Sequence, residues 1–244
     1  MNYKTTRIEV IQKEQKGENQ MFLTERANNL NISREALVSQ VINEIEKCIK
    51  SLQENSAKFP WDNRLVYAET LAQSYYQTSH TPRIEALALS RCSANSIFFP
   101  FFVESLKGEL GHENLALQDL QSLGYSLESF PELPATSSFY QSIFYLINYE
   151  SPLSILGYRL PLEGFAIQDS EIILYEKILA LYGESATSFY KVHALEDVSH
   201  YTKGLEMLAM CEIKDLIAIS KACQQLAYLD QALSEAIAKK HLSK

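Results

Sequence analysis

Two short segments of this sequence combine histidine and carboxylate side chains at spacings that can bind a metal ion. The first is Glu109-Leu-Gly-His112, and the second contains His193, Asp197 and His200. Residues three, four or seven positions apart lie on one face of an α-helix, so each segment would present its polar side chains together. Imidazole and carboxylate ligands without thiolates suit Fe(II) or Mn(II). The pattern therefore predicts a site for such ions.

Both segments interrupt helical faces that are otherwise mostly apolar. Phe102 and Leu120 lie on the predicted face of the first segment, and Phe189 and Met207 lie on that of the second. Burying ionisable groups without partners costs several kcal/mol each, so an inward-facing cluster needs pairing or a metal ion. Taken alone, a histidine on such a face is more often a hydrogen-bonded core residue. The metal interpretation therefore depends on the two segments meeting.

Glu163 is the predicted third carboxylate of this site. Its predicted helical face runs from Leu160 through Ile167, and the preceding Pro161 is expected to bend the helix. Glu171, farther along the same segment, is the alternative. With either acid the set contains three histidines and three carboxylates. Zinc is a poorer match, because structural zinc sites favour four ligands that commonly include sulfur.

The composition predicts an all-α protein. Only eight glycines and seven prolines occur in 244 residues, and most fall between long periodic stretches of good helix formers. We expect residues 1–25 to form an N-terminal arm and residues 26–244 to form one compact domain of about seven helices. The predicted helices cover about 33–55, 64–78, 83–92, a start between 95 and 100 through to 124, 136–149, 152–181, 187–210 and 213–240.

Charge and hydropathy narrow the class of function. The formal net charge of −8 argues against nucleic acid and anionic membranes as partners, since both select clustered Lys and Arg. No apolar run approaches the roughly 20 residues that span a bilayer, and no signal peptide is recognisable. The four cysteines form no CxxC pair, which gives no indication of a zinc ribbon or disulfide framework. We expect a cytoplasmic protein with a small-molecule substrate, and a homodimer is compatible with the sequence.

The motifs resemble those of the heme-oxygenase-like di-iron oxidases and oxygenases, which include CADD-like proteins and a fatty-acid decarboxylase. The resemblance rests on Glu109-x2-His112, then Glu163, then His193-x3-Asp197-x2-His200, and it covers about residues 31–210. It implies a bundle of the heme oxygenase and TenA kind. It also implies two Fe(II) ions, with Mn as a substitute, and O2 as co-substrate for oxidising an amino-acid- or fatty-acid-like molecule.

The resemblance also implies how the ligands divide. One iron would be held by Glu109, His112 and a bridging Glu163, and the other by the three residues of the second segment. A substrate cavity is expected beside them, with aromatic walls that are otherwise interpreted as plain core packing. The expected wall residues are Phe98, Phe102, Phe189 and Tyr201.

Two alternatives remain open at the level of sequence. The first is a TenA- or PqqC-like enzyme on the same fold without a di-iron centre. A TenA-like enzyme would require an active-site cysteine, and neither Cys92 nor Cys211 has a supporting motif. The second alternative is a non-catalytic interaction protein, which failure to bind any metal would favour.

Overall fold

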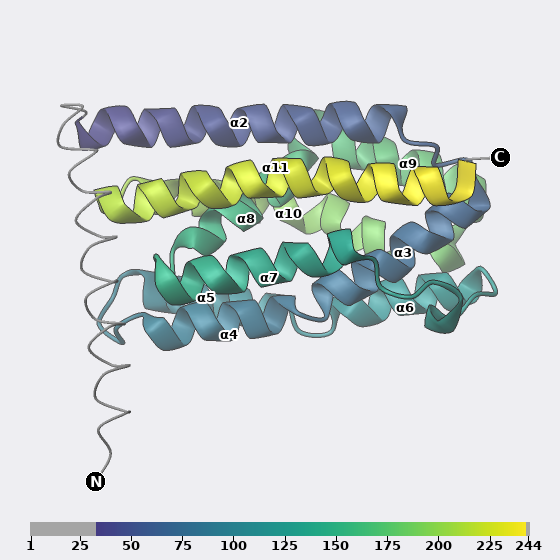
Figure 1. The fold of residues 1–244 in the computed structure, drawn as a ribbon, viewed down its shortest axis with the longest axis horizontal. Helices are drawn as coiled ribbons and strands as arrows, with labels where there is room; N and C mark the ends of the chain where they lie inside the picture. The colour runs from purple at the N-terminus through teal and green to yellow at the C-terminus, as the bar shows by residue number, and fades with distance from the viewer. Residues whose placement is uncertain (1–32, 243–244) are drawn as a thin grey trace, which may run out of the picture.

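The computed structural model describes residues 33–242, and every regular element in that range is a helix. This confirms the all-α prediction, whereas the predicted arm at residues 1–25 lies outside the described residues. In Figure 1, α2 and α11 run side by side along the long axis, with α7 and α4 below them and α8 to α10 behind. The helices are α2 (Arg34–Lys58), α3 (Arg64–Thr78), α4 (Thr81–Arg91), α5 (Phe98–Gly108), α6 (His112–Ser122), α7 (Pro134–Tyr149), α8 (Ser154–Glu163), α9 (Ser170–Tyr182), α10 (Ser188–Leu208) and α11 (Ile213–Leu242).

The starts of α2 and α3 follow from polar caps in the sequence. The Ser33 hydroxyl accepts a hydrogen bond from the backbone N–H of Ala36 at 3.2 Å. The Asn63 side-chain oxygen accepts from the backbone N–H groups of Leu65 and Val66. Each cap satisfies donors that the first helical turn leaves without an intrahelical partner. Both starts therefore lie where the sequence predicts them.

Two of the predicted long helical segments are each divided into two helices. The first was predicted to be continuous, which is wrong, whereas the second was expected to be interrupted or bent near Pro161 and breaks a few residues later. The helix expected to run to residue 124 ends at Gly108 and restarts at His112, since Gly111 has a φ of 93° that an α-helix cannot contain. The helix expected over 152–181 breaks at a 3-10 segment, Gly164–Asp169. Pro161 lies inside α8 and does not end it. The number of helices within residues 33–242 is accordingly larger than the seven predicted.

Helix α8 is held against α11 at very short range. A Cβ atom added to Gly157 would lie 2.0 Å from the backbone oxygen of Ile219, so a side chain at this position would force the two backbones apart. Around this contact lies the larger apolar core, which includes Leu156, Leu160 and Ile219. Glycine thus permits the approach that fixes α8 in the bundle.

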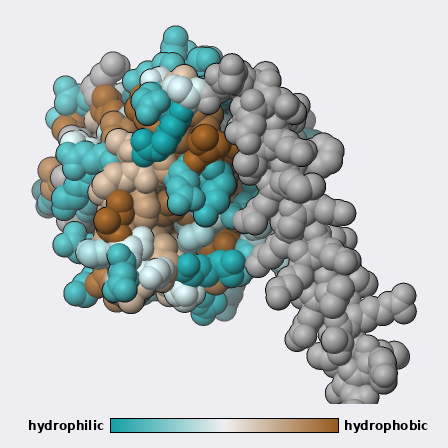
Figure 2. Space-filling view, turned by 90° about the vertical axis from the view of Figure 1, so that its left-hand side faces the viewer, coloured by the Kyte–Doolittle hydropathy of each residue, from teal (hydrophilic) through white to brown (hydrophobic). Residues whose placement is uncertain are grey.

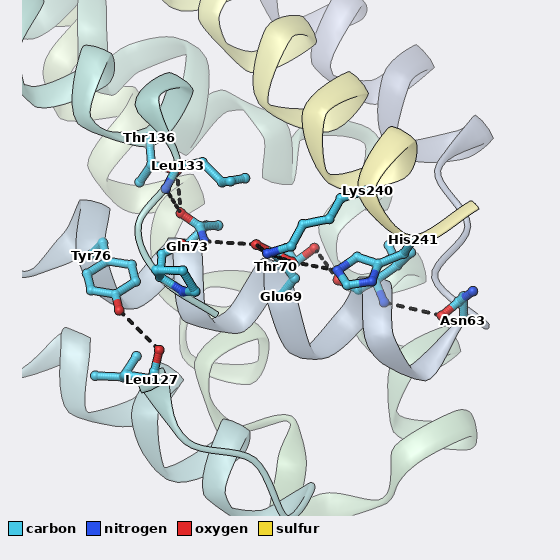
Figure 3. Close-up of polar contacts among 12 residues, drawn as sticks. Asn63, Glu69, Thr70, Gln73, Tyr76, Leu127, Leu133, Thr136, Lys240 and His241 are labelled. Carbon is cyan, nitrogen blue, oxygen red and sulfur yellow. Dashed lines mark hydrogen bonds and ion pairs between the residues drawn. The ribbon is translucent and has the colours of Figure 1, made fainter. Parts of the chain in front are cut away.

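A buried polar cluster joins the middle of α3 to the end of α11 (Figure 3). Glu69 is fully buried, and its carboxylate lies 2.7 Å from Lys240 Nζ and 2.5 Å from His241 Nε2. The Gln73 amide donates to Glu69 at 3.2 Å and its oxygen accepts from the Thr136 hydroxyl at 2.6 Å. The polar groups of Glu69 and of the Gln73 amide therefore have partners, and the cluster lies at one end of the bundle.

The opposite end of the molecule carries exposed apolar side chains. Figure 2 shows them gathered near the middle of this end face and surrounded by hydrophilic residues. The exposed apolar residues of the chain include Ile97, before α5, and Met210, between α10 and α11. No helix within residues 33–242 has the length and apolar character needed to cross a membrane.

Candidate metal centre

The six predicted ligands come from three parts of the fold. Glu109 and His112 flank the turn between α5 and α6, and Glu163 is the last residue of α8. The remaining three ligands share α10. Packing of α10 against α6 and α8 brings these parts together around one interior region.

The turn at Gly111 places the first pair of side chains close to each other without a continuous helix. His112 Nδ1 lies 3.8 Å from a Glu109 carboxylate oxygen, which is too long for a hydrogen bond. This nitrogen is buried and has no hydrogen-bond partner among the described residues. The ring centroids of His112 and His193 are 5.4 Å apart, so the first segment meets the second at this point.

Helix α10 orients the second set of side chains. His193 Nδ1 lies 2.7 Å from the backbone oxygen of Phe189, one turn earlier. A carbonyl oxygen only accepts, so this nitrogen carries a proton and, in the neutral ring, the lone pair is on Nε2. One turn later, Asp197 Oδ1 lies 3.9 Å from His200 Nδ1. The backbone of α10 thus fixes the tautomer of a predicted ligand, as is usual for metal-binding histidines.

Arg159 is a residue of this site that the sequence analysis did not identify. Its Nη1 lies 2.6 Å from the buried Glu85 carboxylate, its Nε donates to Glu163 at 2.8 Å, and its Nη2 lies 3.5 Å from Glu109. Arg159 precedes Glu163 by four residues on α8, and this spacing places the two side chains on one face. That spacing is the signal that could have revealed the pair, whereas Glu85 is 74 residues away in sequence.

Carboxylates outnumber cations in this region. Burial raises the pKa of Asp197 to about 9, with a further contribution from the charge of Glu171. Burial alone raises the pKa of Glu171 to about 8, and it raises that of Glu85 to about 7 against the pull of Arg159. One Glu171 carboxylate oxygen is buried without a hydrogen-bond partner among the described residues. One guanidinium therefore does not balance the acids gathered around it.

The predicted ligands are of the types that bind metal cations. In this conformation, however, their side chains are not arranged around a common position that a metal ion could occupy. Within residues 33–242, no group of three or more His, Cys, Asp or Glu side chains has the arrangement of a metal site. Arg159 binds two of the predicted ligands, Glu109 and Glu163. The buried His112 nitrogen and the excess of carboxylates are the features that a bound cation would satisfy. Closing the ligand set would require side-chain movements around Arg159.

A cavity of about 280 Å³ borders the candidate centre. Glu109, Glu163, His193 and Asp197 line it, together with Phe189, one of the four predicted wall residues. The other three lie elsewhere: Phe102 and Tyr201 belong to the apolar core and Phe98 packs against it. Additional aromatic walls come from residues that the sequence analysis did not select, which are Phe59, Trp61, Phe165 and Tyr190.

The fold resembles known heme oxygenase-like structures. A domain of unknown function with a heme oxygenase-like fold from Shewanella denitrificans superposes with a TM-score of 0.68, at 20% identity over 87% of this chain and 94% of that chain. A TenA homolog from Pseudomonas syringae pv. tomato gives a TM-score of 0.68 at 11% identity, over 85% and 96% of the two chains. No protein-family profile and no curated protein matches the sequence. The likeness confirms the predicted heme oxygenase-like fold.

Proposed function

We propose that this chain is a non-heme di-iron oxidase or oxygenase that uses O2 to oxidise a small organic substrate. The observation that carries the proposal is the excess of buried carboxylates at the edge of one small cavity that His193 also lines. The His112 ring lies 5.4 Å from that of His193, and His200 Nδ1 lies 3.9 Å from Asp197. Natural proteins seldom bury acids without partners, and such groups mark functional sites. The motif resemblance and the heme oxygenase-like fold are consistent with this assignment.

Two groups of ligands would hold the ions. Glu109, His112 and Glu163 would bind one, and His193, Asp197 and His200 would bind the other, with Mn as a possible substitute for Fe. When bound, the two iron ions supply the redox chemistry towards O2. Glu171 is the further carboxylate available at the same cavity wall.

The chain contributes ligand position and a shielded reaction space. Arg159 fixes the Glu163 carboxylate through Nε, and Glu85 in turn holds the guanidinium from the opposite side. The Phe189 carbonyl orients the His193 ring. The aromatic walls limit the water that can reach the reacting bond and present one part of the substrate to the site.

Anaerobic Fe(II) titration of the full chain tests this proposal. We expect two Fe(II) ions per chain, and O2 consumption after air is admitted. The double variant His193→Ala, Asp197→Ala should lose binding of at least one ion. His80→Gln is the matched control, because His80 stacks on Tyr140 outside the candidate centre.

Two results would overturn the proposal. One is the absence of Fe(II) and Mn(II) binding by the folded chain. The other is equal binding by the parent chain and the double variant, which would place the ions elsewhere.

A cysteine-dependent enzyme of the TenA kind is the second candidate, because the fold also resembles a TenA homolog. Its thiol should border the cavity and ionise readily. Cys92 and Cys211 do not line the cavity, and burial raises the pKa of Cys92 to about 11 and that of Cys211 to about 12. These positions argue against thiolate chemistry and favour the di-iron proposal.

A further inference from the structure

One part of the cavity wall, which we call the second end, is formed by residues outside the candidate metal centre. Helix α2 contributes residues spaced three and four apart, and the neighbouring α11 does the same. The α2 residues are Leu52, Asn55, Ser56 and Phe59, and the α11 residues are Asp230, Leu233, Ser234 and Ile237. This spacing places each set on one helical face. Helix α3 adds neutral hydroxyl and amide groups, namely Thr70, Ser74, Gln77 and Thr78.

Asp230 is the charged group of this second end. Its Oδ2 accepts a hydrogen bond from the Asn55 amide at 3.2 Å, and the described residues provide it with no ion pair. Glu69, a fully buried acid of α3 that lies near the end of α11, has Lys240 and His241 as partners. Among the residues that line the cavity, the cationic or potentially cationic ones are Arg159 and His193, and both belong to the candidate metal centre. Asp230 therefore faces the cavity as an acid without a counter-ion.

The walls near Asp230 suit an organic cation. Aromatic side chains surround the cavity, including Trp61, Phe59 and Tyr190. The faces of aromatic rings attract ammonium groups, and the rings also bind an apolar body. The carboxylate group of a ligand bound at the same place would be repelled by Asp230, and the described residues of the second end include no cationic side chain to bind it.

We propose that Asp230 binds the ammonium group of a small amine substrate whose apolar body lies against the aromatic walls. This inference rests on the proposed function, because it identifies the substrate class of the same cavity. It distinguishes an amine-bearing substrate from a simple fatty acid, two classes that the motifs alone leave equal. The volume of about 280 Å³ limits the ligand to a small molecule.

Isothermal titration calorimetry with three probes that share a phenylethyl body and differ in their polar group tests the inference. The probes are 2-phenylethylamine, 2-phenylethanol and 3-phenylpropionate, titrated into the full chain at pH 8 with chelator and, separately, with Fe(II) under anaerobic conditions. We expect the amine to bind at least about 10-fold more tightly than the other two, since charge-assisted hydrogen bonds are the stronger ones. Asp230→Asn should remove this preference.

Two further variants keep the result interpretable. Glu235→Gln changes an exposed acid on the same helix and should leave amine affinity within about 2-fold. Asp230→Glu retains the charge and should bind the amine more tightly than Asp230→Asn does. Circular dichroism establishes that each variant is folded. Equal affinity for all three probes, or an amine preference that survives in Asp230→Asn, would overturn the inference.

The metal-free titration separates this inference from the proposed function. Amine binding that depends on Asp230 in a chain that binds no Fe(II) would support the amine site and overturn the di-iron proposal. Binding of two Fe(II) ions without any amine preference would support the di-iron proposal and overturn the amine site.

Discussion

Glu69 and Asp197 are both buried acids, but their surroundings differ. Glu69 is matched by Lys240, His241 and Gln73, all within 3.2 Å (Figure 3). Asp197 has a histidine nitrogen at 3.9 Å and more acids nearby, and burial raises its pKa to about 9. The first arrangement is complete within the chain. In the second, the acids outnumber the described cations, and the proposed metal ions would supply the missing positive charge.

This difference separates structural from functional burial of charge. A complete ion cluster holds helices together, and removing one member leaves the others buried and unpaired. An incomplete cluster lowers stability, and proteins retain such clusters where binding or catalysis requires them. Removal of a cation that neutralises buried acids should therefore lower stability, whereas removal of the charge of an unpaired acid should raise it. The two expected losses come first below and the two expected gains follow.

Replacement of Arg159 by Met should cause the largest loss of stability. The change leaves three carboxylates, those of Glu85, Glu109 and Glu163, buried without their cation, and breaking a buried pair costs about 3–5 kcal/mol. Urea unfolding measures the change. The exposed Arg83→Met provides the control. A loss for Arg159→Met as small as that for the control would show that Arg159 does not neutralise the acids.

Replacement of Lys240 by Met should lower stability by about 2 kcal/mol, because Glu69 keeps His241 and Gln73 but loses its full positive charge. The neighbouring Lys239 is exposed, so Lys239→Met should change the free energy of unfolding by less than about 0.5 kcal/mol. Thermal unfolding of the pair measures the difference. Equal melting temperatures for the two variants would contradict the structural role of this cluster.

Replacement of Glu171 by Gln should stabilise the metal-free chain by about 3–4 kcal/mol at pH 7, from about 1.4 kcal/mol per pKa unit over the interval from 4.5 to 7. The folded pKa of about 8 lies above the ordinary value of 4.5. The parent chain therefore loses stability as pH rises from about 4.5 to 8, and the variant should not show this loss. Unfolding at pH 5 and pH 8 measures the effect, and the exposed Glu176→Gln should leave the pH dependence unchanged.

Replacement of Asp230 by Asn should give a slightly smaller gain of about 3 kcal/mol at pH 8. Burial raises the pKa of Asp230 to about 6, against the hydrogen bond from Asn55. The cost of ionising Asp230 thus appears between pH 3.8 and 6 and persists above that range. Unfolding at pH 4 and pH 8 compares the two chains. A gain of equal size at both pH values would assign the effect to something other than charge.

The sequence predicts helices well where their signals are local. Ser33 and Asn63 are strong caps, and α10 forms without a break where its periodicity places it. The break at Gly111 was not predictable, because a glycine tolerates either continuation of the helix or a left-handed turn and tertiary packing selects between them.

Part of the candidate site was predictable because its sequence signal is also local. The spacing of His193, Asp197 and His200 is local, so it could be read from the chain. The contact between Glu85 and Arg159 joins helices 74 residues apart, and no periodicity indicates it. Asp230 likewise gains its position at the cavity only through packing of α11 against α2.

The close approach of Gly157 to Ile219 also bears on the length of ligand that the proposed amine site would favour. It fixes α8, which carries Arg159 and Glu163, at one point along α11. Asp230 follows Ile219 on the same helix, about 16 Å farther along at about 1.5 Å per residue. The separation between the two ends of the cavity is thus set by rigid backbone and not by flexible side chains. For the proposed amine site, this predicts that a ligand of different length would favour an acid one helical turn away, at position 234, which also lines the cavity.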